Sequence, residues 1–163
     1  MKQTLKTPLT PAAAPAAGLA APIDAFAGAH EIALKNTGDM KWEQMLPCLG
    51  KDSPRYTILR VDPTTNATSL MIEFPSAMHI PRHSHVKSET HFLLRGSHTF
   101  GYDGKLFTVN EGGYFYMAGG MIHEAWVPAG AKAIIVLEDG WKVDWSEGEP
   151  TAADLGKGTP PSR

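Results

Sequence analysis

Hydrophobic and polar residues alternate over short segments in the middle of the chain, between about residue 55 and residue 138. This alternation places the apolar side chains on one face of an extended strand. No segment after residue 50 repeats its apolar residues with the period of a helix, so we predict an all-β sandwich or barrel. Glycine, proline or other turn residues bound the candidate strands, which are residues 55–61, 68–74, 89–95, 98–102, 105–109, 113–118, 122–127 and 132–138. Asp103-Gly104, between the fourth and fifth of these, is a strong signal for a tight hairpin.

The two ends of the chain lack this alternation. Residues 1–30 are rich in alanine and proline, which predicts an extended N-terminal arm. Residues 147–163 have a similar composition, and we predict a flexible C-terminal tail there. The folded domain should therefore span residues 31–146, because the 163 residues of the whole chain suit one domain rather than two.

Composition narrows the function classes. The net charge is −2 with no basic cluster, which argues against a nucleic-acid partner. No segment approaches the ~18 consecutive apolar residues of a membrane-spanning helix, so no membrane partner is predicted. The single cysteine, Cys48, excludes an intrachain disulfide and fits a cytoplasmic location. A periplasmic location stays open if the arm acts as a weak signal peptide, although its prolines make it a poor one.

Four of the seven histidines lie between residues 79 and 96, and their spacing predicts a metal site. In the pattern His83-x-His85-x3-Glu89, the two imidazoles share one face of an extended segment. Glu89 begins the next predicted strand and can approach the same point. His123 follows a glycine turn and is the candidate for a fourth ligand. Imidazole and carboxylate together suit iron, nickel, copper, zinc or manganese.

The same residues carry a resemblance to the cupin superfamily. Its first signature has the form His-x-His, three or four residues, Glu, six residues, Gly, and its second ends in a glycine turn followed by His. The matching positions in this chain are His83, His85, Glu89, Gly96, Gly112, Gly120 and His123. The sequence departs from the signatures at Ala77, Ala118 and Val127, none of which corresponds to a metal ligand.

The resemblance implies a double-stranded β-helix, the jelly-roll barrel of RmlC-like cupins. It also implies that His83, His85, Glu89 and His123 bind one divalent transition metal per chain, with Fe(II) favoured and Mn, Ni, Cu or Zn as alternatives. The chain is loosely similar to the sensor domains of anti-sigma factors and to diketone-cleaving dioxygenases. Cupins commonly dimerise through their sheets, and the apolar Phe92 and Leu94 on the outer face of one predicted strand favour a homodimer.

Three functions are compatible with such a site. The first is a metal-dependent dioxygenase that acts on a small enolisable or phenolic substrate, since four protein ligands leave open positions on a six-coordinate metal. The second is a redox-neutral isomerase or lyase that uses the metal as a Lewis acid. The third is a non-catalytic module that binds metal or a small ligand for sensing or storage.

His91 is the candidate catalytic residue. It lies two residues after Glu89, so a regular strand would point it into the barrel. There it would orient a ligand, transfer protons or replace a ligand. The alternative is an interior polar residue that a backbone carbonyl or water satisfies. His79 and His98 lie near predicted strand ends, and we expect both at the surface. We expect Cys48 to pack in the core, and Trp141 and Trp145 to pack a C-terminal strand onto the sandwich.

Overall fold

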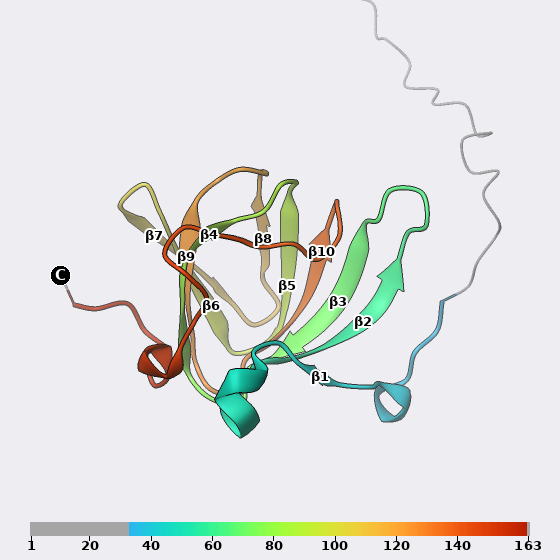
Figure 1. Ribbon diagram of the computed structural model, residues 1–163, viewed down its shortest axis with the longest axis horizontal. Helices are drawn as coiled ribbons and strands as arrows, with labels where there is room; N and C mark the ends of the chain where they lie inside the picture. Colours follow the sequence, from blue (N-terminus) through green and yellow to red (C-terminus); the bar gives the residue numbers. More distant parts are fainter. Residues whose placement is uncertain (1–32, 163) are drawn as a thin grey trace, which may run out of the picture. The chain divides into compact units, whose positions relative to one another are not determined.

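A computed structural model describes residues 33–162, in which two antiparallel sheets face each other (Figure 1). Within these residues, one sheet has the strand order β1-β2-β3-β10-β5-β8 and the other has the order β11-β4-β9-β6-β7. The strands are β1 Glu43–Gln44, β2 Arg55–Val61, β3 Thr68–Glu73, β4 Met78–Ser84, β5 Glu89–Arg95, β6 Ser97–Tyr102, β7 Lys105–Asn110, β8 Tyr114–Met117, β9 His123–Val127, β10 Lys132–Leu137 and β11 Asp144–Trp145. Three short 3-10 helices accompany them in the described range: η2 Thr37–Asp39, η3 Pro47–Asp52 and η4 Ala152–Asp154. The all-β, jelly-roll prediction is confirmed.

The predicted strands agree closely with the observed ones. β2 and β5 have the predicted bounds, and the other predicted strands differ by one residue at one or both ends. Asp103 and Gly104 have positive φ angles of 49° and 70°, as a tight hairpin turn between β6 and β7 requires. The alternation predicted for β5 is also present, because His91 is buried whereas Phe92 and Leu94 on the outer face are 44% and 43% exposed.

Strand β4 was not among the predicted strands, and Pro81 explains why. Proline cannot donate to the hydrogen-bond ladder and is confined to strand edges and bulges. The pairing of β4 with β9 shifts register between Ile80 and His83, so Pro81 lies at the irregular part of the strand. Such a bulge re-aims the side chains that follow it.

The core lies between the two sheets. On β3 and β10, every second side chain is buried, as the sequence alternation requires. Each fully buried Leu, Ile or Phe contributes roughly 1.5–3 kcal/mol relative to exposure. The apolar core side chains include Leu70, Ile72, Leu93, Ile135 and Leu137 from the first sheet and Met78, Ile80, Phe100, Ala125 and Val127 from the second.

After β10 the chain crosses from the first sheet to the second (Figure 1, orange to red). We call residues 139–146 of this crossing the strap. Its short strand β11 pairs with the end of β4, through Asp144 opposite Ser84 and Trp145 opposite His83. The predicted C-terminal strand is therefore present, although it is only two residues long.

The segment that follows the strap differs from the expected flexible tail, because it packs against the barrel. Pro150 is fully buried, and Leu155 forms a bridge with Met78 at the other end of β4. The amide of Gly156 donates to the carbonyl of Ala77 at 2.8 Å. β11 covers only the last residues of β4, so the rest of this sheet edge is free to accept the chain.

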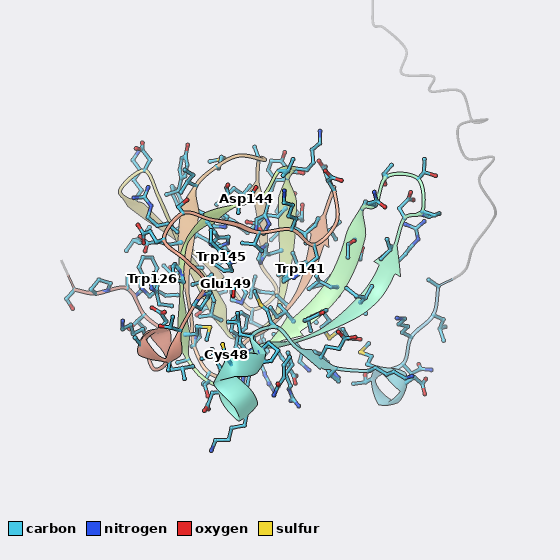
Figure 2. The ribbon with its side chains drawn as sticks, in the orientation of Figure 1. Cys48, Trp126, Trp141, Asp144, Trp145 and Glu149 are labelled. Atoms are coloured by element: carbon cyan, nitrogen blue, oxygen red, sulfur yellow. The ribbon has the colours of Figure 1, made fainter. Side chains whose placement is uncertain are left out.

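Three further sequence predictions concern Cys48, the N-terminal arm and membrane-spanning helices. Cys48 is exposed on η3, so its predicted core position is wrong (Figure 2). The buried Leu46 just before η3 occupies the core there instead. The predicted arm, residues 1–30, lies outside the described residues. Among residues 33–162, no helix is long and apolar enough to cross a membrane.

Candidate metal centre

Strands β4 and β9 bring two of the predicted ligands together. His83 and His123 are direct cross-strand partners in the ladder, with ring centroids 4.2 Å apart. His85 follows at the end of β4. A glycine turn positions the start of β9. Gly120 adopts φ +77°, and a Cβ on Gly119 would lie 2.5 Å from the carbonyl oxygen of Val86. Side chains larger than glycine would push β9 away from the segment that carries His85.

The four predicted ligands converge inside the barrel. His83, His85 and His123 each offer a ligand atom, and these atoms lie within 4.8 Å of one another. Glu89 approaches from β5 in the opposite sheet, with Oε1 3.0 Å from His123 Nε2 and Oε2 3.4 Å from His85 Nε2. All four residues are buried. The structure thus gathers the side chains that the sequence spacing singled out.

Backbone carbonyls hold the three imidazole rings in one orientation. A carbonyl only accepts hydrogen bonds, so each Nδ1 must carry a proton, and each Nε2 presents a lone pair whenever its ring is neutral. Metal-binding histidines are commonly oriented in this way. The three bonds run from His83 Nδ1 to the Pro81 carbonyl at 2.7 Å, from His85 Nδ1 to the Lys142 carbonyl at 2.8 Å, and from His123 Nδ1 to the Met121 carbonyl at 3.0 Å.

These residues fit a divalent metal. Lone pairs and a carboxylate that point into one buried space repel each other unless a cation lies between them. Oε1 of Glu89 is buried, lacks a hydrogen bond of regular geometry among the described residues, and lies 3.0 Å from Nε2 of His123. A buried carboxylate oxygen beside imidazole nitrogens is a suitable donor set for a borderline metal ion.

For two of the ligands, Glu89 and His83, the electrostatics favour the protonation states that metal binding needs. Burial alone would raise the pKa of the Glu89 carboxyl, but the neighbouring His91 and His123 rings hold this pKa well below its usual range. For His123, burial lowers the pKa and Glu89 outweighs it, so the pKa is raised. For His83, burial and then the proximity of His123 lower the pKa to about 3. Glu89 is therefore ionised and His83 neutral near pH 7.

His91 lies beside the ligands and contacts one of them. Its Nε2 is 3.0 Å from Oε2 of Glu89, and the ring is buried. Of the three roles that the sequence left open, this contact supports the orientation of a ligand. The other ring nitrogen, Nδ1, is buried without a hydrogen-bond partner among the described residues.

The surface prediction for His98 is wrong. The ring is 2% exposed and points inward from β6, between Phe74 and Phe100. Strand β6 places His98 and Phe100 on the same inner face, because they are two residues apart. His79, in contrast, lies on the outer side of the sheet, stacked on Trp126 and hydrogen-bonded to Glu124 at 2.9 Å.

The ligands open into a cavity of ≈ 60 Å³ between the sheets. This volume has room for a few water molecules or a small organic ligand. The strap closes one side of it with Trp141, Val143 and Trp145, and the two indoles are seen between the sheets in Figure 2. Apart from these indoles, the histidines and Glu89, the cavity is lined by apolar side chains.

Two sheets of this topology around three histidines and a glutamate define a cupin. The chain belongs to the ChrR cupin-like domain family, whose profile matches residues 30–140. This confirms the superfamily resemblance drawn from the sequence. No match was found among curated proteins.

Solved structures with the same fold share little sequence with the chain. An RmlC-like cupin from Shewanella frigidimarina is 16% identical, with a TM-score of 0.54, over 65% of this chain and 89% of that one. An acetylacetone dioxygenase from Acinetobacter johnsonii is 15% identical, with a TM-score of 0.54, over 68% and 74% of the two chains. A DMSP lyase from Ruegeria pomeroyi is 17% identical, with a TM-score of 0.54, over 68% and 64%. At this identity the likeness shows the fold alone.

Proposed function

We propose that this chain is a metal-dependent cupin enzyme, a dioxygenase that acts on a small enolisable or phenolic substrate. One observation carries the proposal: three imidazoles with fixed tautomers and one carboxylate converge in a buried, mostly apolar cavity. The residues that would hold the metal are His83, His85, Glu89 and His123. A divalent metal bound there, with Fe(II) favoured, would supply Lewis acidity and one-electron chemistry.

The charge of the site favours an anionic substrate. Three neutral imidazoles and one carboxylate leave a divalent metal with a net charge of about +1. An enolate or a phenolate would complement that charge in a cavity from which the apolar walls exclude water. The name of the Acinetobacter protein makes acetylacetone, an enolisable diketone, the first substrate to test.

The surrounding residues have distinct tasks in this proposal. His91 donates through Nε2 to Glu89 and keeps the carboxylate turned toward the three imidazoles. Phe100 stacks on Phe115 with centroids 3.8 Å apart, which gives the cavity a rigid aromatic wall. Trp141 and Trp145 cover the site from the strap and limit the entry of water.

The test begins with elemental analysis of the full chain purified without added metal. The protein is then loaded anaerobically with Fe(II) and mixed with acetylacetone and a panel of small phenols, with oxygen consumption as the readout. His123→Ala should lose both metal and activity. His79→Ala serves as the matched control because His79 lies outside the cavity.

Two results would contradict the proposal. If the wild-type chain retains no divalent metal, the assignment of a metal centre is wrong. Turnover of a panel compound without oxygen uptake would instead indicate a redox-neutral lyase or isomerase at the same site.

A further inference from the structure

Two imidazole nitrogens beside the cavity are used neither as metal ligands nor to orient a ligand. His91 and His98 both border the cavity, with ring centroids 5.7 Å apart and ring planes at 73°. Their exposed fractions are 6% and 2%. Each ring carries a buried nitrogen without a hydrogen-bond partner among the described residues: Nδ1 of His91 and Nε2 of His98.

The hydrogen-bond roles of these nitrogens follow from their neighbours. The ionised carboxylate of Glu89 only accepts, so Nε2 of His91 carries a proton, and in the neutral ring Nδ1 presents a lone pair. Burial, and then the proximity of His91, lowers the pKa of His98 to about 3, so this ring is neutral near pH 7. A neutral imidazole has one N–H and one lone pair, and either tautomer of His98 leaves Nε2 in need of a partner.

No other side chain or backbone group of residues 33–162 pairs with the two nitrogens. The nearby rings are those of Phe74, Phe100 and Phe115, which approach the histidines edge to face. A buried polar atom without a partner is costly, so an occupant that supplies the missing hydrogen bonds is favoured. A carbonyl oxygen cannot pair with Nδ1 of His91, because both are acceptors. A hydroxyl donates one hydrogen bond and accepts others, so it matches both rings.

We propose that His91 and His98 bind a hydroxyl group of the substrate at the end of the cavity away from the strap. The inference rests on the proposed function, because the other end of the same substrate lies at the metal ligands. That end favours an anionic oxygen, so the substrate class is a small molecule with a carboxylate or enolate at one end and a hydroxyl at the other. His98 is then a specificity-determining residue that the sequence did not reveal.

Two probes of nearly equal shape test this assignment. 3-Hydroxypropanoate and butanoate differ by a terminal hydroxyl in place of a methyl group. The full chain is loaded with Zn²⁺, which is redox-inactive, and titrated with each probe by calorimetry. We expect the hydroxy acid to bind about 10-fold more tightly, since a buried acceptor left unpaired weakens binding by roughly 5- to 150-fold.

A variant then locates the preference. His98→Phe keeps an aromatic ring but removes both nitrogens, and the preference for the hydroxy acid should fall by about threefold or more. His79→Phe makes the same change on the outer side of the sheet and should retain the wild-type preference. If His98→Phe does not fold, nitrogen NMR of the histidine rings in wild-type protein replaces it. The His91 and His98 resonances should shift with the hydroxy acid and not with butanoate.

Equal binding of the two probes, or binding of neither, would overturn the assignment. So would a full preference in folded, zinc-loaded His98→Phe, or unchanged ring resonances. The proposed function fails separately. Selective binding by a protein that never consumes oxygen would retain the hydroxyl site and contradict the dioxygenase. Oxygen consumption without any preference for the hydroxy acid would support the dioxygenase and contradict the hydroxyl site.

Discussion

The two ends of the cavity use the same side chain in opposite ways. At the strap end, each of the three histidines donates Nδ1–H to a backbone carbonyl and directs Nε2 into the cavity. At the inner end, His91 is fixed on one side by Glu89, and Nε2 of His98 has no comparable anchor in the described part of the chain. Three rings are therefore held before anything binds, whereas two rings retain unsatisfied nitrogens.

This difference separates affinity from selectivity. Rings that are already oriented lose little conformational freedom when a ligand arrives, so the strap end is suited to tight binding of an ion. Buried nitrogens without partners penalise any occupant that cannot pair with them, so the inner end is suited to discrimination between small molecules. Histidine can serve for both tight binding and discrimination because its ring has two nitrogens. The two ends of the cavity differ only in the hydrogen bond that the second nitrogen makes.

The largest expected effect comes from removing an anchored ring. His83→Ala or His123→Ala should lower metal affinity by more than the ~10–100-fold that is typical of losing an outer hydrogen-bond partner, because a donor itself is lost. Glu89→Ala should weaken binding less, since three imidazoles remain. Elemental analysis and competition with a chelator measure this effect. Full metal occupancy in both histidine variants would rule out the site.

Removal of the His91 contact with Glu89 should have a smaller effect on metal affinity. His91→Ala frees Oε2 of Glu89 to rotate, and metal affinity should fall by roughly 10–100-fold. His91→Gln can still donate to the carboxylate and should recover part of that loss. An alanine variant with wild-type metal affinity would show that Glu89 is oriented without His91.

The buried ring of His98 also predicts how the stability of the metal-free protein depends on pH. The pKa of His98 is about 3 in the folded chain and near 6.5 when unfolded, so the unfolded state binds more protons between these values. Stability is therefore lost as the pH falls from about 6.5 toward 3, by up to about 1.4 kcal/mol per pH unit for this histidine. Denaturant unfolding of wild type and His98→Gln should diverge in that window. Parallel pH profiles would show that His98 is solvated.

The smallest effect is expected at Lys142, whose backbone carbonyl, and not its side chain, holds His85. The side chain of Lys142 is 69% exposed, and its 3.8 Å contact with Asp144 is a surface ion pair. Lys142→Ala leaves the carbonyl that accepts from His85, so stability should change by no more than about 0.5 kcal/mol and metal affinity should be unchanged. A clear drop in metal affinity would mean that the lysine side chain itself supports the site.

Sequence patterns predicted the strands because alternation and turn residues agree along most of the chain. Pro81 hid β4, since it interrupts a ladder that reforms on both sides of it. The spacing of His83, His85 and Glu89 was informative because the period of a strand places alternate side chains on one face. The same period placed His98 beside Phe100, but the expectation that a polar residue near a strand end faces solvent led to the wrong prediction.

Other features of the site leave no pattern in the sequence. The ring of His85 is oriented by the carbonyl of Lys142, which lies 57 residues away along the chain. Every residue type has a backbone carbonyl, so the residue type at position 142 cannot indicate that its carbonyl orients His85. The strand that pairs the strap with β4 is only two residues long, which is too short a signal to recognise in the sequence.

The bond between the strap and His85 has a thermodynamic consequence. An ion that favours the anchored form of His85 also favours the docked form of the strap, and reciprocity requires that docking favour the ion by the same factor. Lys142 is exposed on this segment, so trypsin can attack the chain there when the strap opens. Cleavage after Lys142 would then slow as metal binds, and a simple digestion time course would follow the occupancy of a centre buried between the two sheets.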